Sequence, residues 1–485
     1  MAAPLGTGAG VKNTGPELVK GLGLFDATTI VMGSMIGSGI FIVSAEIGRE
    51  VGSPGLLLLS WVLSGLMTVI AAVTYGELAA MMPRAGGQYV YLREAFGSLL
   101  GFLYGWTLFL VIQTCTIAAV AVAFGKFVGV FVPWVSDANL LANFGTLHLW
   151  GHAAALTVSS QQFIAIVCLM GLAGLNVLGL RTGAWVQNIF TTLKVAALLG
   201  VIAVGLTWSR GHALAVSTAA GGFWQGARWD LATLTILSVA LVGPLFSSDA
   251  WNNVTFTGAE VINPKRNLPL ALFVGTLTIC ALYLACNFAY LHLLSFSAIQ
   301  HAPADRVATA AAQSVLGSKG AGLMAAAIII STFGCINGLT LAGARVYYAM
   351  AKDGLFFRSV ARVNSKHHTP AVSLLFQGVW ASLLTLSGSY NELLAYVIFA
   401  VVLFYILTIA GLFWLRVKRP EAPRPYRAWG YPVLPALYII FALFVEWALL
   451  MHKAMRSLAG LSIVALGIPV FYWWQRRNAG GASRE

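Results

Sequence analysis

Long apolar runs separated by short polar segments make up most of this chain. Each run has about 20 residues or more, enough for a helix rising 1.5 Å per residue to cross about 30 Å of hydrocarbon. Their apolar character is continuous rather than alternating, which favours helices over the strands of a membrane β-barrel. The pattern predicts an all-α integral membrane protein with twelve transmembrane helices. The predicted spans are residues 24–47, 54–81, 97–131, 160–180, 185–207, 231–258, 268–295, 320–351, 369–388, 390–415, 432–452 and 456–475.

Composition and charge agree with a membrane protein. The chain is 59% hydrophobic and only 9% charged, far from the balance of a soluble domain. Most of its 29 lysines and arginines fall in alternate loops, on the side of the N-terminus. This positive-inside distribution explains the net charge of +13 and predicts cytoplasmic tails, 1–23 and 476–485, in a multi-pass protein of the cell membrane. Neither a removable signal peptide nor a nucleic-acid partner is expected.

The first predicted span contains three glycines and two serines between Gly33 and Gly39, in mid-membrane. Their low helix propensity predicts a break that frees backbone amides and carbonyls. Amides near Ser38, which open the second half-helix, would favour a carboxylate. Carbonyls near Met35 would face a cation, so a zwitterion fits the arrangement. The alternative is a close helix-packing seam without a ligand.

A second interruption lies in the sixth span, between Gly243 and Asn253, where a proline, paired serines, Asp249 and amides occur together. Proline removes a backbone donor, and a charge in mid-membrane costs at least about 2.5 kcal/mol, so this stretch should line a cavity. Breaks five helices apart are typical of inverted repeats around a midplane site. The repeats are predicted at 24–207 and 231–415, followed by two extra helices within 432–475.

Cysteine and histidine spacing predicts no metal site and no cofactor. All cysteines lie in apolar segments, and the outer loop from 132 to 159 contains none. A disulfide-linked heavy chain is therefore not expected. The cysteines are Cys115, Cys168, Cys280, Cys286 and Cys335.

Several short motifs, taken in order along the chain, resemble a known family: the amino acid-polyamine-organocation (APC) superfamily, and within it the L-type amino acid transporter (LAT) family and its bacterial relatives. The resemblance covers nearly the whole chain. It implies the LeuT-like fold, a five-plus-five inverted repeat with discontinuous helices 1 and 6, and amino acid transport by alternating access. The motifs are Gly37-Ser38-Gly39-Ile40-Phe41, Gly76-Glu77-Leu78, Pro83-Arg84-Ala85-Gly86-Gly87-Gln88-Tyr89, Trp251-Asn252 to Glu260, Asn263-Pro264, Phe333-Gly334-Cys335-Ile336-Asn337-Gly338 and Ala344-Arg345.

The resemblance also implies how an L-amino acid would be held at its carboxylate. The backbone amides of Ser38 and Gly39, with Gly37 beside them, match the family's carboxylate site. Because these contacts involve only groups common to all amino acids, selectivity would come from the side-chain pocket.

The resemblance assigns the opposite side of the substrate to carbonyls. Those of Met35, Phe246 and Asp249 match the family's contacts to the α-amine, and the ring of Phe246 matches an aromatic gate. Trp251 and Asn252 are further candidate substrate contacts, although packing is the ordinary role of a tryptophan in such a span.

Lys194 lies well inside the fifth span. One explanation is snorkelling of its ammonium toward an interface. By resemblance, a lysine here occupies the place of the sodium ion of sodium-coupled relatives, which implies transport without sodium.

The acidic residues leave several alternatives open. Asp249 could pair with a cationic substrate side chain, with the substrate amine or with a proton. Glu77 and Glu260, near the inner ends of their spans, could pair with loop arginines such as Arg84 or Arg345, as a gating network or as structural ion pairs.

The sequence therefore predicts a secondary active amino acid transporter, an exchanger or a sodium-independent proton-coupled importer, for neutral amino acids. A cationic or broad substrate range using Asp249 is the main alternative. A transporter-like sensor or a channel is a more distant one. A membrane enzyme is disfavoured because no acid, base or nucleophile cluster emerges, so no catalytic residue is predicted.

Overall fold

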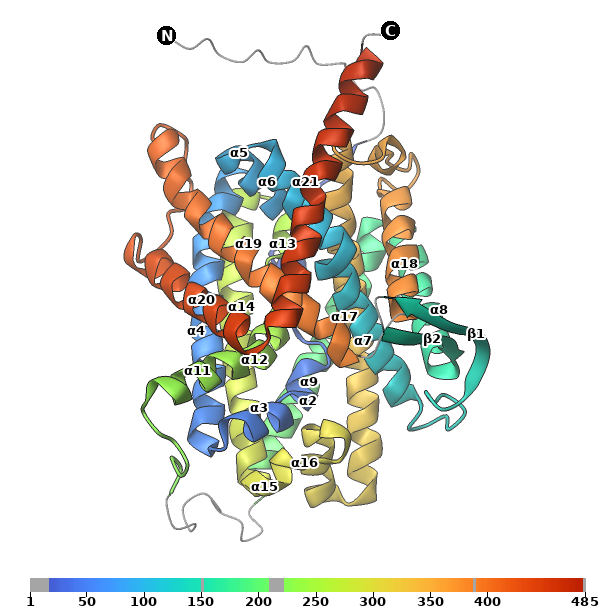
Figure 1. The fold of residues 1–485 in the computed structure, drawn as a ribbon, viewed down its shortest axis with the longest axis vertical. Helices are drawn as coiled ribbons and strands as arrows, with labels where there is room; N and C mark the ends of the chain where they lie inside the picture. The colour runs from blue at the N-terminus through green and yellow to red at the C-terminus, as the bar shows by residue number, and fades with distance from the viewer. Residues whose placement is uncertain (1–16, 150–151, 209–221, 387–389, 483–485) are drawn as a thin grey trace.

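The computed structural model describes residues 17–149, 152–208, 222–386 and 390–482, and it is largely helical. Figure 1 shows a bundle of long helices with shorter helices at both ends. The helices that precede residues 209–221, which lie outside the described part, are α1 (Leu24–Met35), α2 (Gly39–Ile42), α3 (Ser44–Val51), α4 (Pro54–Met81), α5 (Gln88–Phe96), α6 (Ser98–Thr107), α7 (Gln113–Val128), α8 (Ser160–Val177) and α9 (Leu180–Thr207). A π-helical turn, Leu108–Ile112, joins α6 to α7.

The remaining helices follow residues 209–221. They are α11 (Leu231–Ala240), α12 (Val242–Ser247), α13 (Asn253–Phe256), α14 (Pro264–Leu293), α15 (Phe296–Gln300), α16 (Val307–Leu316), α17 (Ser318–Lys352), α18 (Ala371–Thr385), α19 (Tyr390–Lys418), α20 (Val433–His452) and α21 (Ala454–Ala482). Short 3-10 turns occur at Gly258–Glu260, Pro303–Asp305 and Arg358–Ala361.

Ten helices in the described residues are long and apolar enough to cross a membrane. They match ten of the twelve predicted spans. The other two predicted spans contain shorter apolar helices, Leu231–Ser247 and Ala371–Thr385. The first is cut short by the break after Ser247, and the end of the second prediction reaches residues 387–389, which lie outside the described part.

The all-α prediction was wrong in one of the predicted loops, as far as the described residues show. Strands β1 (Leu140–Leu149) and β2 (His152–Ser159) form an antiparallel pair in the predicted outer loop. A strand pair is acceptable there because its backbone groups need not all be satisfied in hydrocarbon. In addition, α21 continues to Ala482 through most of the predicted tail 476–485.

The predicted interruption of the first span is present. Helix α1 ends at Met35, and α2 begins at Gly39 after three non-helical positions. In the sixth span, α12 ends at Ser247 and α13 begins at Asn253, with Ala250 at a φ of 66°. These segments leave helix backbone groups free to contact other elements.

Helix α17 lies at the centre of the bundle, where it contacts α1, α7 and α9. Helix α14 packs along α4 and also contacts α1 and α9. Helices α2, α3, α15 and α16 gather at the lower end in Figure 1, whereas α5 lies at the upper end, toward which α21 projects. This arrangement places the α1 break among α9, α14 and α17.

Candidate functional site

The two interrupted helices meet at Gly39 and Ser247. A Cβ atom added at Gly39 would lie 2.3 Å from Oγ and 3.2 Å from Cα of Ser247. Only glycine permits this approach, because any larger residue would overlap the neighbouring backbone. Contacts between α2 and α12 and between α1 and α13 bring the two breaks to one region of the bundle.

Lys194 of α9 reaches the end of α1. Its Nζ donates hydrogen bonds to the carbonyls of Gly33 at 2.7 Å and Ile36 at 2.9 Å, and the side chain is only 1% exposed. The ammonium therefore points into the bundle rather than toward an interface. A cation at this position satisfies carbonyls that the helix itself leaves without a partner, and it complements the negative end of the helix dipole.

Other carbonyls at the end of α1 also have donors. The Tyr283 hydroxyl donates to Met35 at 2.9 Å, and the Gly37 amide donates to the same carbonyl at 2.9 Å. Ser331 Oγ donates to Ile36 and Gly37 at 3.1 and 2.9 Å. Sequence reasoning missed both side chains: Ser331 is a polar interruption of an apolar run, whereas a tyrosine in such a run gives no signal.

Asp249 lies just after α12 and is buried. Its Oδ1 accepts a hydrogen bond from the Tyr405 hydroxyl at 2.5 Å. Beside it is a cavity of about 10 Å³, room for about one water molecule, whose polar lining includes Gln88, Gln113 and Asn252. None of the residues that line this cavity is basic, so the carboxyl group faces polar neutral groups.

Asn252 belongs to a polar network that links three segments. Its Nδ2 donates to Gln88 Oε1 at 2.7 Å, and Gln88 Nε2 donates to Thr408 Oγ1 at 3.0 Å. The network connects the second break to the start of α5 and to α19. Gln88 was part of a family motif but was not predicted as a site residue.

Trp251 and Phe246 are both buried, at 2% and 7% exposure. The ring of Trp251 lies 4.8 Å from that of Tyr75 and 5.2 Å from that of Tyr405, measured between centroids. In this conformation Trp251 packs in an aromatic cluster, while Phe246 lies in the last turn of α12, next to the break.

At the end of the bundle that carries α5, the predicted pairing of Glu260 with Arg345 is confirmed. Arg345 donates to both Glu260 carboxylate oxygens, at 2.9 and 3.0 Å, and both side chains are fully buried. The Glu260 backbone carbonyl accepts the amides of Gly21 and Leu22 at 2.9 and 3.0 Å. This pair therefore ties the segment before α1 to the centre of the bundle.

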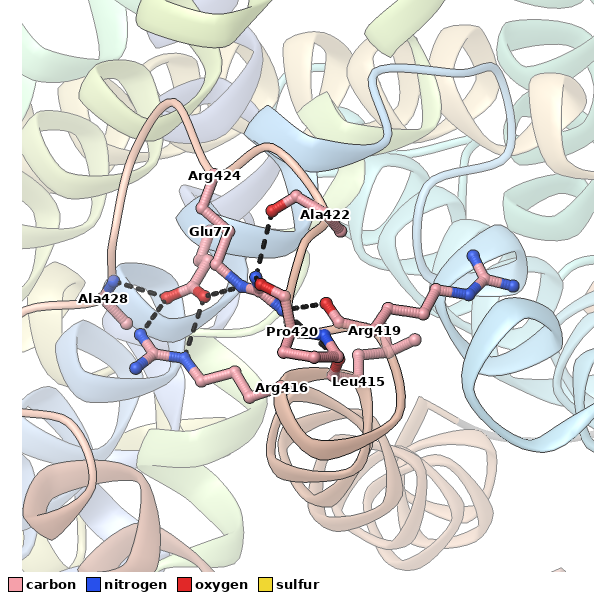
Figure 2. Close-up of polar contacts among 8 residues, drawn as sticks. All are labelled: Glu77, Leu415, Arg416, Arg419, Pro420, Ala422, Arg424 and Ala428. Atoms are coloured by element: carbon pink, nitrogen blue, oxygen red, sulfur yellow. Dashed lines mark hydrogen bonds and ion pairs between the residues drawn. The ribbon is translucent and has the colours of Figure 1, made fainter.

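The predicted pairing of Glu77 with arginines is confirmed, but Arg84 is not its partner. Glu77 instead accepts hydrogen bonds from Arg416 at 3.0 and 2.6 Å and from the Ala428 amide at 2.7 Å, with Arg424 Nε 3.2 Å away (Figure 2). Arg416 comes from α19, far away in the sequence, so spacing gave no hint of it.

Arg84 lies 3.7 Å from Glu94 instead. Burial would raise the pKa of the Glu94 carboxyl, but hydrogen bonding and charge from Arg419, together with Arg93, lower it overall. Glu94 therefore remains ionised and links α5 to the end of α19.

Comparison with known proteins gives extended matches. The model of the family described as "Amino acid permease" matches residues 22–471. A serine/threonine exchanger of Bacillus subtilis is 30% identical over 95% of this chain and 98% of its own length. The human large neutral amino acids transporter small subunit 2 is 30% identical over 97% of this chain and 83% of its own length. The mouse Asc-type amino acid transporter 1 is 29% identical over 94% and 81%, respectively.

Proposed function

Because this chain belongs to the amino acid permease family, we propose that it exchanges neutral amino acids across the membrane by alternating access, without sodium. The named relatives are transporters rather than enzymes, and two names specify serine/threonine or large neutral amino acids. The main structural support is the meeting of two helix breaks beside a buried ammonium group. A broken helix pair near mid-membrane provides backbone donors and acceptors for a zwitterion.

In this proposal, the amides of Ser38 and Gly39, beside Gly37, bind the substrate carboxylate. The carbonyls of Phe246 and Asp249 receive the α-amine. The Met35 carbonyl already accepts two hydrogen bonds, so it would receive the amine only after one of those donors moves away.

The side chains of Phe246, Trp251 and Asn252 are proposed to shape and close the substrate pocket. Their burial in aromatic and polar clusters fits a closed conformation. Opening these clusters would supply the space that an amino acid side chain needs.

The proposal includes twelve spans arranged as a five-plus-five inverted repeat in the cell membrane, with both termini cytoplasmic. Basic residues concentrated at the end that carries α5 support this orientation. We also propose that transport needs no disulfide-linked partner, since all five cysteines lie within helices.

A second candidate is transport of cationic or a broad range of amino acids. It is favoured by the buried carboxyl of Asp249, beside which no basic residue lines the cavity. A cationic side chain or a proton would compensate such a charge. In that case, Asp249→Asn should weaken lysine and arginine transport far more than transport of leucine or serine.

Counterflow in proteoliposomes tests the proposed function. Unlabelled serine or leucine inside the vesicles should accelerate uptake of labelled neutral amino acid, with excess lysine and arginine competing weakly. Replacing external sodium by choline should leave the rate unchanged. Uptake without trans-stimulation would contradict exchange and indicate a proton-coupled importer or a channel. Strong competition by lysine would favour the cationic alternative.

Lys194→Ala should lower the counterflow rate about tenfold or more. The carbonyls of Gly33 and Ile36 would lose hydrogen bonds from a charged donor, each worth about 1.5–3 kcal/mol. Lys126→Ala, near the outer end of α7, provides a control and should retain most activity. A sodium requirement in the parent protein, or full activity in Lys194→Ala, would contradict the proposed role of this ammonium.

A further inference from the structure

A groove on the surface of the bundle lies away from the helix breaks. It has a volume of about 750 Å³ and runs between α4, the first turns of α14 and the segment that precedes α20. Its bed is almost entirely apolar. It is lined by Val73, Pro269, Leu270, Phe273, Pro425, Tyr426 and Trp429, with Lys265 and Arg266 at one end.

The groove has a fixed wall. Glu77 accepts the Ala428 amide and lies against Arg424 (Figure 2), which anchors the segment from 424 to 428 to α4. A Cβ atom at Gly76 would lie 3.0 Å from the Tyr426 ring, so this segment packs closely on α4. The groove is therefore a built feature rather than a gap beside a loose loop.

Charge is distributed unevenly along this groove. Lys265 and Arg266 are exposed at the start of α14, and within the described part of the chain neither has a carboxylate partner. Trp429 is 76% exposed on the opposite wall. An exposed tryptophan on a membrane protein is typical of the boundary between the hydrocarbon and the lipid head groups.

We propose that this groove binds one anionic phospholipid from the leaflet at that end of the bundle. The acyl chain would lie along Leu270 and Phe273, and the phosphate would meet Lys265 and Arg266. Basic residues beside an apolar bed complement both parts of such a lipid, whereas a soluble anion would gain nothing from the bed. This site is independent of the proposed transport function.

Binding of a short-chain phosphatidylglycerol to the purified full chain, measured by native mass spectrometry, tests the site. The double variant Lys265→Gln/Arg266→Gln should lower the affinity about thirtyfold, because each basic residue near an anionic lipid contributes about fivefold. Arg358→Gln/Lys366→Gln, a pair of exposed basic residues outside the groove lining, should bind as the parent does. Thermal unfolding in detergent establishes that both variants are folded.

Two further measurements separate the apolar and charged contributions. Leu270→Trp, which fills the bed and keeps both charges, should also weaken binding, and phosphatidylcholine of equal chain length should bind the parent at least tenfold more weakly. Equal binding of both lipids, parental binding by Leu270→Trp, or complete competition by soluble glycerol phosphate would overturn the proposal. Equal loss in the Arg358→Gln/Lys366→Gln control would assign the effect to overall charge and would also overturn it.

Discussion

Gly39→Val should abolish substrate binding, or reduce the counterflow rate at least about tenfold. The added Cβ would lie 2.3 Å from Ser247 Oγ and 3.2 Å from its Cα. Overpacking of this kind costs about 1–3 kcal/mol, and a β-branched residue also restricts the backbone at the start of α2. The strain would be relieved by separating α2 from α12, the contact that brings the two breaks together. Counterflow per folded molecule measures the effect.

A matched glycine separates this local effect from general damage to a membrane helix. Gly200 in α9 is exposed and has no heavy atom within 4 Å of its added Cβ, so Gly200→Val should leave counterflow near the parental rate. Size-exclusion chromatography in detergent reports folding of both variants. A folded Gly39→Val protein with parental affinity would show that substrate recognition does not need the close approach at Ser247.

Much of the architecture was predictable because the bilayer constrains it strongly. An apolar run must be helical to satisfy its backbone, so hydropathy located the long helices to within a few residues. The breaks were also predictable, since glycine, serine and proline weaken a helix locally. The pairing of Glu260 with Arg345 was anticipated because both lie near one end of their spans and an unpaired buried charge is costly.

Other contacts were not predictable because they depend on how distant helices pack. Glu77 and Arg416 are 339 positions apart, and nothing in the sequence distinguishes Arg416 from the other basic residues near it. The hydrogen bond from Tyr405 to Asp249 is a similar case, since tyrosine in an apolar run reads as ordinary core. The strand pair at 140–159 was missed because it lies outside the long helices, where hydropathy carries little information.

Arg345→Met should lower the free energy of unfolding by about 3–5 kcal/mol. The substitution removes both hydrogen-bond donors from a carboxylate with no exposed surface, and an unpaired charge is far more costly than a missing pair. The double variant Glu260→Gln/Arg345→Met should recover much of this loss, because it removes the charge as well. Denaturant unfolding in detergent, followed by tryptophan fluorescence, measures the three proteins.

An exposed ion pair is the appropriate control for this double-mutant comparison. Arg49 lies 2.8 Å from Asp305, with side chains 42% and 35% exposed, so Arg49→Met should cost only about 0–1 kcal/mol. If Arg345→Met costs no more than that, the buried pair contributes little to the stability of the fold. If Arg345→Met is strongly destabilised and the double variant is not, the loss of stability comes from leaving the Glu260 charge buried without a partner.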